Sequence, residues 1–172
     1  MIYELPFEDL IKDNKQDFIK KVNDISQFIG IRPEWLMFCM WFESRLNHKS
    51  QNKASGATGL IQFMPATARQ LGTTTDKLLL MSNVQQLEYV KKYFSPYVNK
   101  LRSFVDVYLT IFFPLAVGKP DDFIIQTKQL SSALIAKQNP IFDLNKDGEL
   151  TKAEIKKRLL GMVPEKFKEK FI

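Results

Sequence analysis

The stretch that decides the fold is PEWLMFCMWFESRLN, residues 33–47. Its centre, residues 35–42, is an unbroken apolar run, and Pro33 suits the first position of a helix. A helix that is apolar on every side is a buried central helix, because no face of it is compatible with water. A buried strand is the alternative for such a run, but the Met and Leu content and the proline start favour a helix.

Helical patterns continue on both sides of this stretch. Apolar residues recur with the helical period over residues 17–29, and Gly30 follows them as a helix end. Strand-like alternation is hard to find, so the predicted fold class is all-α. The further predicted helices lie at residues 65–71, from Asp76 onward, at 84–101 with a bend near Pro96, at 103–117, at 122–137 and at 154–160.

Composition limits the function classes. The net charge of +6 suggests an anionic partner, which could be nucleic acid, a membrane surface or an acidic polymer. The single cysteine, Cys39, excludes an intramolecular disulfide and a cysteine-based zinc cluster. The single histidine, His48, excludes multi-histidine metal sites, and its polar neighbours predict an exposed loop residue rather than a catalytic base.

The first ten residues contain Glu4, Glu8 and Asp9 and no long apolar run, so they do not resemble a secretion signal. The longest apolar-rich run, residues 107–117, is shorter than the roughly 20 residues of a membrane-spanning helix. We therefore expect no membrane span. If the protein acts outside its cell of origin, something else must carry it there.

Glu43 directly follows the apolar run. An ionised carboxylate in apolar surroundings loses solvation, so its pKa should rise. A carboxylic acid that is still protonated near neutral pH can act as a general acid. The alternative is that Glu43 is the first exposed residue beyond a core helix, paired with Arg45 or a lysine.

A second segment, SGATGLIQFMPATA at residues 55–68, has two glycines that bracket a turn, followed by an apolar run with one amide, Gln62. It could be a tight turn into a buried element, with Gln62 hydrogen-bonded internally. It could equally be the wall of a cleft, where Gln62 offers a donor and an acceptor to a ligand.

The two motifs together resemble the lytic transglycosylases that carry a soluble-lytic-transglycosylase (SLT) domain, within the lysozyme-like superfamily. They occur in the family's order and separation, and the resemblance covers residues 31–118, most closely 41–72. The residues that match are Glu43, Ser44 and Asn47, then Ser55, Gly56, Ala57, Gly59, Leu60, Ile61, Gln62, Met64, Pro65, Thr67 and Ala68.

The resemblance implies an activity and a role for each residue. The family cleaves the β-1,4 bond between N-acetylmuramic acid and N-acetylglucosamine in peptidoglycan and leaves a 1,6-anhydromuramic end. Glu43 corresponds to the single catalytic acid, which then serves as base. Residues implied in shaping the cleft or binding substrate are Ser55, Gly56, Gly59, Leu60, Gln62 and Met64, with Pro65 at the structural end of the motif.

The sequence departs from the family at one place. The family usually has a later Ala-Tyr-Asn-Ala-Gly segment, whose tyrosine and asparagine lie in the active site. The corresponding residues 111–118, IFFPLAVG, contain neither. Tyr108, one helical turn earlier, is the candidate replacement and is predicted to bind substrate.

Two alternatives to the transglycosylase remain open. A muramidase would hydrolyse the same bond with a second carboxylate, for which Asp76, Glu88 and Asp106 are available without a distinguishing spacing. A weakly active wall-binding or structural module of a phage or secretion apparatus is the other. The expected place of action in each case is the cell wall, in the periplasm, outside the cell or on a virion.

Residues 143–154, DLNKDGELTKAE, match the twelve-residue EF-hand calcium loop in full. Gly148 stands at the sharp turn, and Thr151 could act through water. An acidic surface turn is the alternative. The predicted ligands of a structural Ca²⁺ ion are Asp143, Asn145, Asp147, Glu149 through its carbonyl, and Glu154.

We predict a lysozyme-like transglycosylase domain at residues 1–138 and, at 139–172, the calcium loop with a basic helical tail packed on it. The expected partner is the peptidoglycan glycan strand, with the basic tail attracted to the anionic wall. Nucleic acid is not expected because no recognisable binding module is present. We expect a monomer that uses no cofactor for catalysis.

Overall fold

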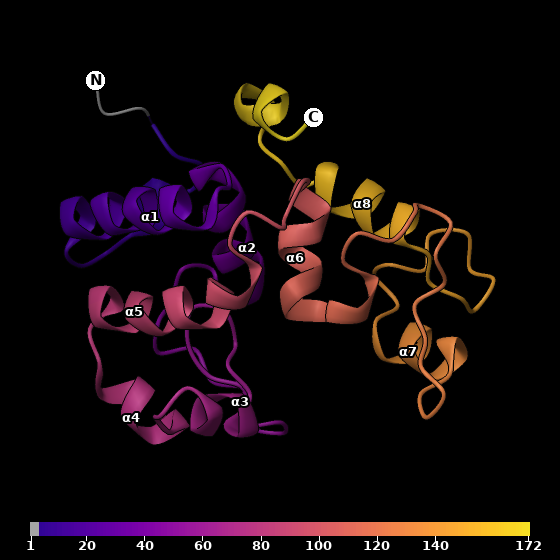
Figure 1. Ribbon diagram of the computed structural model, residues 1–172, viewed down its shortest axis with the longest axis horizontal. Helices are drawn as coiled ribbons and strands as arrows, with labels where there is room; N and C mark the ends of the chain where they lie inside the picture. The colour runs from indigo at the N-terminus through magenta and orange to yellow at the C-terminus, as the bar shows by residue number, and fades with distance from the viewer. Residues whose placement is uncertain (1–3) are drawn as a thin grey trace. The chain divides into compact units, whose positions relative to one another are not determined.

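A computed structural model describes residues 4–172 of the chain. Within that range it is helical and contains no sheet, only three isolated bridges, which confirms the predicted all-α class (Figure 1). The chain forms two compact units, which divide between Lys100 and Leu101. This packing groups residues differently from the predicted division at residue 138, which stays a prediction.

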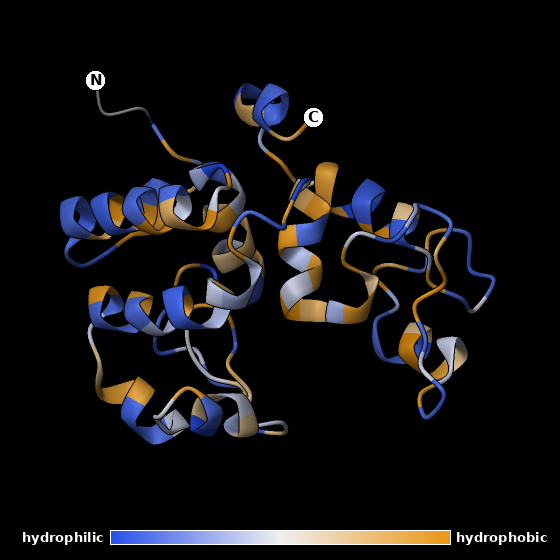
Figure 2. Ribbon diagram, viewed as in Figure 1, coloured by the Kyte–Doolittle hydropathy of each residue, from blue (hydrophilic) through white to orange (hydrophobic). Residues whose placement is uncertain are grey.

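The first unit is built around α2, and α1 packs against both α2 and α5. Figure 1 shows α1 and α5 side by side, and Figure 2 shows hydrophilic and hydrophobic residues alternating along each of them. The elements are η1 (Glu8–Leu10), α1 (Lys15–Ile29), α2 (Pro33–Ser44), α3 (Pro65–Gln70), α4 (Thr75–Leu80), α5 (Asn83–Phe94) and η2 (Ser95–Tyr97).

The predicted central helix is confirmed. Helix α2 begins at Pro33, as its fixed φ favours, and its residues 36–40 are completely buried. Burial of five consecutive side chains is possible only if every face of the helix is covered, which is why this segment lacks polar residues. Arg45, in the left-handed conformation with φ of 56°, ends the helix immediately after Glu43 and Ser44.

The second unit contains α6 (Phe104–Phe112), η3 (Pro114–Ala116), α7 (Ser132–Gln138), α8 (Lys152–Leu160) and η4 (Glu165–Lys170). Helix α6 packs against α8 and η3. The predicted helix over residues 122–137 is wrong for its first half. Backbone pairing explains the difference, because the Ile125 N–H donates to the Leu150 carbonyl at 2.8 Å and the Ser131 side chain caps the start of α7.

Helix α5 is shorter than the predicted 84–101, because a 3-10 turn at Ser95–Tyr97 replaces the last helical residues. Pro96 lies inside that turn, and proline cannot donate the backbone hydrogen bond that an α-helix needs there. At the other end, Ser82 and Gln85 form a capping box that fixes where α5 starts.

Candidate active site

Glu43 is the next-to-last residue of α2 and is half-buried. Within the described residues 4–172, its carboxylate has no hydrogen bond or ion pair. Arg45, the partner considered from sequence, instead donates to the carbonyl oxygens of Trp41 at 2.8 Å and Phe42 at 3.2 Å. Its guanidinium lies 4.3 Å from the centroid of the Trp41 ring. The acid is therefore not neutralised by its neighbour.

Burial raises the pKa of Glu43 to about 7. The position at the C-terminal end of a helix acts in the same direction, because the partial negative charge there disfavours an anion. The rise predicted from the apolar run is thus present in the structure. Glu43 therefore stays protonated to a higher pH than an ordinary glutamate does, and the protonated state is the one that a general acid requires.

The glycine-bracketed turn is fixed to α2 and α5 by hydrogen bonds to one residue, Leu60. The Ser44 hydroxyl lies 2.9 Å from the Leu60 carbonyl and is shared with the Met40 carbonyl, also at 2.9 Å. The Leu60 N–H donates to Oε1 of Gln86 at 2.7 Å. The residue beside Glu43 and a buried amide of α5 therefore hold this turn from both sides.

Gln86 is a residue that the sequence analysis missed. It is completely buried, and its Nε2 donates to the carbonyls of His48 at 2.8 Å and Leu78 at 3.1 Å. Gly59 lies against it, so that a Cβ at residue 59 would be 2.8 Å from the Gln86 Cδ. Only the place of Gln86 on the buried face of α5 could have indicated it, because an amide among apolar residues needs internal partners.

Gln62 is hydrogen-bonded internally, as in one of the two alternatives considered from sequence, and its role in binding substrate stays a prediction. Its Nε2 donates to the carbonyls of Gly59 at 3.1 Å and Ser50 at 3.2 Å, which closes the turn. Both amide hydrogens are used in this way, so Gln62 has only its Oε1 acceptor left to offer a ligand. The side chain is half-buried and its backbone has a positive φ of 54°.

Ser55 and Met64, the other predicted substrate-binding residues of this segment, are exposed. The Ser55 hydroxyl accepts a hydrogen bond from the Ala57 N–H at 3.2 Å and so stabilises its own turn. Met64 is 46% exposed and immediately precedes α3. Their role in binding substrate stays a prediction.

Tyr93 of α5 is a second residue that the sequence analysis missed. Its ring packs edge-on against Phe63, 6.3 Å away between centroids, directly after Gln62. Burial, then the neighbouring Tyr97 and the charge of Glu43, raise the pKa of Tyr93 to about 12. Tyr93 therefore keeps its phenolic proton at every working pH and lies within electrostatic range of Glu43.

A family model, the transglycosylase SLT domain, matches residues 21–109, more than half of the chain. The chain belongs to the transglycosylase SLT domain family. The match includes Glu43, the glycine turn and the helices that hold them. Membership confirms the predicted family and indicates lytic transglycosylase action on peptidoglycan at the cell wall. No curated protein sequence matches the chain.

The end of the SLT domain lies in α6 of the second unit. Tyr108 is there, only 2% exposed, with its ring 5.7 Å from that of Phe112 and 5.9 Å from that of Phe142 between centroids. The following residues 111–118 form the end of α6 and η3. A role for Tyr108 in binding substrate stays a prediction.

The three candidates for a second carboxylate differ from Glu43 in their surroundings, because two are ion-paired and one is exposed. Glu88 forms an ion pair with Lys21, and Asp106 forms one with Lys152 at 2.7 Å. Asp76 is exposed in the first turn of α4. The two paired carboxylates already have cationic partners, which leaves them poorly suited to activate a water molecule.

His48 is half-buried, where the sequence predicted an exposed loop residue. It lines a cavity of about 700 Å³ together with Lys12, Asp13, Arg45 and Lys49. Burial and the charge of Lys49 lower the pKa of His48, against an opposing effect of Asp13. Ser44 and Arg45 also line this cavity, but Glu43, the residue before them, does not. The cavity is therefore not a candidate for the place of the reaction.

The loop at residues 143–154 lies beyond the SLT match. Asp143 Oδ2 accepts from the Gly148 N–H at 3.1 Å, and Asp147 Oδ1 accepts from the Glu149 N–H at 2.9 Å. Glu154 Oε1 accepts from the Leu144 N–H at 3.2 Å. These bonds connect the first, middle and last residues of the loop.

One carboxylate oxygen of this loop accepts no hydrogen bond from the described residues. Asp143 Oδ1 is buried and has no hydrogen-bond partner. Over residues 4–172, no group of three or more His, Cys, Asp or Glu side chains is arranged to hold a metal ion. A bound cation would therefore require the carboxylates to turn from their backbone donors toward a common centre.

No helix in the described part of the chain is both long and apolar enough to span a membrane.

Proposed function

We propose that the protein is a lytic transglycosylase that cleaves the bond between N-acetylmuramic acid and N-acetylglucosamine, with Glu43 as acid and then base. The observation that carries the proposal is the half-buried Glu43 carboxyl, which has no partner among residues 4–172 and a pKa raised to about 7, in a chain of the SLT family. A single carboxylate suffices for this reaction because no water has to be activated.

In the first step, protonated Glu43 gives its proton to the glycosidic oxygen, and the bond from that oxygen to C1 of muramic acid breaks. The acetamido group of the same sugar stabilises the cationic centre from within the substrate. In the second step, the Glu43 carboxylate takes the proton of the C6 hydroxyl, whose oxygen bonds to C1. The enzyme returns to its starting state and the product is a 1,6-anhydro sugar.

The supporting residues have separate tasks in this proposal. Ser44, Gln86 and Gly59 keep the turn of Leu60 at a fixed distance from the end of α2. Gln62 offers Oε1 as an acceptor for a sugar hydroxyl or amide N–H. Tyr93 stays neutral and therefore adds no negative charge near Glu43.

The test is digestion of purified peptidoglycan by the wild type, by Glu43→Gln and by Glu169→Gln, an exposed control. Mass spectrometry of the soluble fragments should show anhydro ends with the wild type and the control and none with Glu43→Gln. Reducing ends would instead establish a muramidase. If no variant releases fragments, the protein is a wall-binding or structural module.

We also propose that residues 143–154 bind a Ca²⁺ ion with a structural role. The support is the complete pattern of oxygen donors at the loop spacing and the buried Asp143 Oδ1 without a partner. A buried carboxylate oxygen without a hydrogen bond is unfavourable, and a cation would satisfy it. Asp143, Asn145, Asp147, the Glu149 carbonyl and Glu154 would hold the ion.

Calorimetric titration with CaCl₂ tests the calcium proposal. The wild type should give a binding heat, and Glu154→Gln should lose it because the bidentate carboxylate is gone. Glu149→Gln is the matched control, since residue 149 would contribute only its backbone carbonyl and should bind as before. The absence of heat from the wild type would refute the site.

A further inference from the structure

A buried ion pair connects helix α6 to the start of helix α8. Lys152 Nζ lies 2.7 Å from Asp106 Oδ1, and the two side chains are only 5% and 8% exposed. Burial of two charges is unfavourable unless every remaining donor and acceptor is satisfied. This pair is therefore expected to persist only where the surrounding chain supplies further hydrogen bonds.

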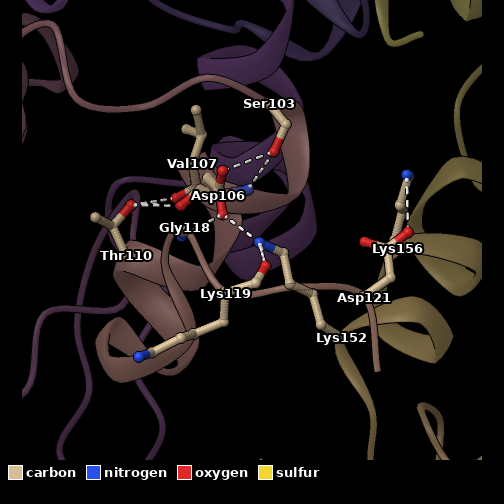
Figure 3. A network of polar contacts seen from close by, with 9 residues as sticks. All are labelled: Ser103, Asp106, Val107, Thr110, Gly118, Lys119, Asp121, Lys152 and Lys156. Carbon is tan, nitrogen blue, oxygen red and sulfur yellow. Dashed lines mark hydrogen bonds and ion pairs between the residues drawn. The ribbon is translucent and has the colours of Figure 1, made fainter. Parts of the chain in front are cut away.

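Figure 3 shows that the chain around the Asp106–Lys152 pair supplies these hydrogen bonds. Asp106 Oδ1 also accepts from the Gly118 N–H at 3.0 Å, and Asp106 Oδ2 accepts from the Ser103 hydroxyl at 2.9 Å. Lys152 Nζ donates in addition to the Lys119 carbonyl at 2.8 Å. The pair thus joins the first turn of α6, the segment after η3 and the first residue of α8.

Lys152 is also part of the calcium loop proposed above. It occupies the tenth of the loop's twelve positions, next to Thr151 and two residues before Glu154. Its N–H donates to the Phe123 carbonyl at 3.0 Å, and the Ala153 N–H donates to the Asp121 carbonyl at 2.8 Å. The last third of the loop is therefore fastened to the chain that follows α6.

Only one partner of the Asp106–Lys152 ion pair lies in the family domain. Asp106 lies within the match to the SLT family, which ends at residue 109, and Lys152 lies beyond it. The pair is a direct side-chain bond between the family domain and the C-terminal segment. A ligand that orders residues 150–154 would hold Lys152 in place and, through it, Asp106.

We propose that the Asp106–Lys152 pair transmits calcium binding at residues 143–154 to helix α6, so that calcium holds the last helix of the SLT domain in its folded state. This inference rests on the calcium site proposed above and does not depend on the cleavage reaction. A ligand that binds only the folded state stabilises it by mass action, about 100-fold at 100 times the dissociation constant. Without the pair, that stabilisation should remain in the loop and α8.

Hydrogen exchange of the full-length protein, in EGTA and in saturating CaCl₂, tests the inference. In the wild type, calcium should slow exchange of both α6 and α8 amides, by about 100-fold at 100 times the dissociation constant. The test variant is Asp106→Asn with Lys152→Met, which removes both charges. The asparagine side chain at residue 106 keeps an acceptor oxygen for the Gly118 N–H, and its NH₂ group can donate to the Ser103 hydroxyl. Its α8 amides should remain protected by calcium, whereas calcium should slow its α6 amides less than tenfold.

Lys156→Met is the matched control, because Lys156 pairs with Asp121 at 3.4 Å in an exposed position. It should keep the full calcium effect on α6. The inference is overturned if calcium protects α6 equally in the double variant and the wild type, or leaves α6 of the wild type unchanged although calorimetry shows binding. A lack of any binding heat would refute the calcium site itself and the inference with it, while leaving the cleavage proposal untouched.

Discussion

The hydroxyl of Ser44 lies 2.9 Å from the carbonyl oxygen of Leu60. This contact joins the end of α2, where Glu43 lies, to the glycine turn of the SLT motif. Because Ser44 is adjacent to Glu43, any shift of the turn is passed to the acid through one peptide unit. The two motifs, which are separate in the sequence, are thus joined directly by a buried hydrogen bond.

Ser44→Ala should destabilise the protein by about 1–3 kcal/mol, because it leaves the buried Leu60 carbonyl without its donor. Urea unfolding measures this change. Ser95→Ala is the control, since the Ser95 hydroxyl makes a similar bond to the Lys91 carbonyl at 2.7 Å in an exposed position. The control should change stability by less than about 0.5 kcal/mol. Equal effects of the two substitutions would contradict the role given to Ser44.

Gly59→Ala should be far more destabilising than Gly72→Ala. Both residues have a positive φ, 85° and 84°, so each substitution carries the backbone strain of about 1–2 kcal/mol. A Cβ at residue 59 would also be 2.9 Å from the Gln86 Nε2, whereas nothing lies within 4 Å at residue 72. The difference in unfolding free energy should therefore be at least about 1–3 kcal/mol. Similar losses of unfolding free energy in the two variants would show that Gln86 can move away from a Cβ at residue 59 at little cost.

Gln86→Leu should destabilise the protein by at least about 2 kcal/mol, because it leaves the Leu60 N–H and the His48 carbonyl without partners. The Leu78 carbonyl keeps the Met81 N–H as a donor. It should also lower wall-digesting activity in molecules that remain folded, since the turn is no longer held. Gln16→Leu on the exposed face of α1 is the control. Full activity of a folded Gln86→Leu protein would show that catalysis does not depend on the hydrogen bonds by which Gln86 holds the glycine turn.

Glu43→Gln should be more stable than the wild type above neutral pH and equal to it in acid. The folded-state pKa of about 7 lies above the ordinary value of 4.5, so the wild type has its full stability below pH 4.5. It loses about 3 kcal/mol as the pH rises through that window, whereas Gln has no charge to bury. Urea unfolding at pH 4 and pH 8 measures the difference. A constant offset at both pH values would contradict a buried, titrating acid.

Wall digestion should depend on pH through the same group. The acid must be protonated at the start, so kcat/KM should fall about tenfold for each pH unit above about 7. The measurement is the rate of clearing of purified walls from pH 6 to pH 9 at constant ionic strength. A rate that stays flat across this range would exclude Glu43 as the acid.

Several features followed from local sequence. The unbroken apolar run at residues 35–42 favoured a buried helix over a buried strand, and Pro33 marked its start. Glu43 was recognisable for the same reason, because its position at the end of an apolar run implied a raised pKa. The motifs at residues 43–47 and 55–68 together indicated the family, which the match over residues 21–109 confirmed.

Other features could not be predicted in this way. Residues 122–131 have helical composition but pair instead with the chain near Leu150, a contact between distant segments. Gln86 and Tyr93 looked like ordinary helix residues, since nothing nearby in sequence indicates that one would hold Leu60 and the other would lie near Glu43. Lys152 looked like one of many lysines and is in fact a buried partner of Asp106.

The sequence by itself therefore determined the helical class, the central helix, the raised pKa of Glu43 and, through the resemblance of two motifs, the family. The first three could be predicted because periodicity, burial and desolvation act over a few neighbouring residues. Only the tertiary structure decided which groups hold that acid's surroundings in place. Hydrogen bonds such as those of Leu60 with Ser44 and Gln86 join residues 16 and 26 positions apart. Such partners are chosen by the packing of whole helices, which no local pattern encodes.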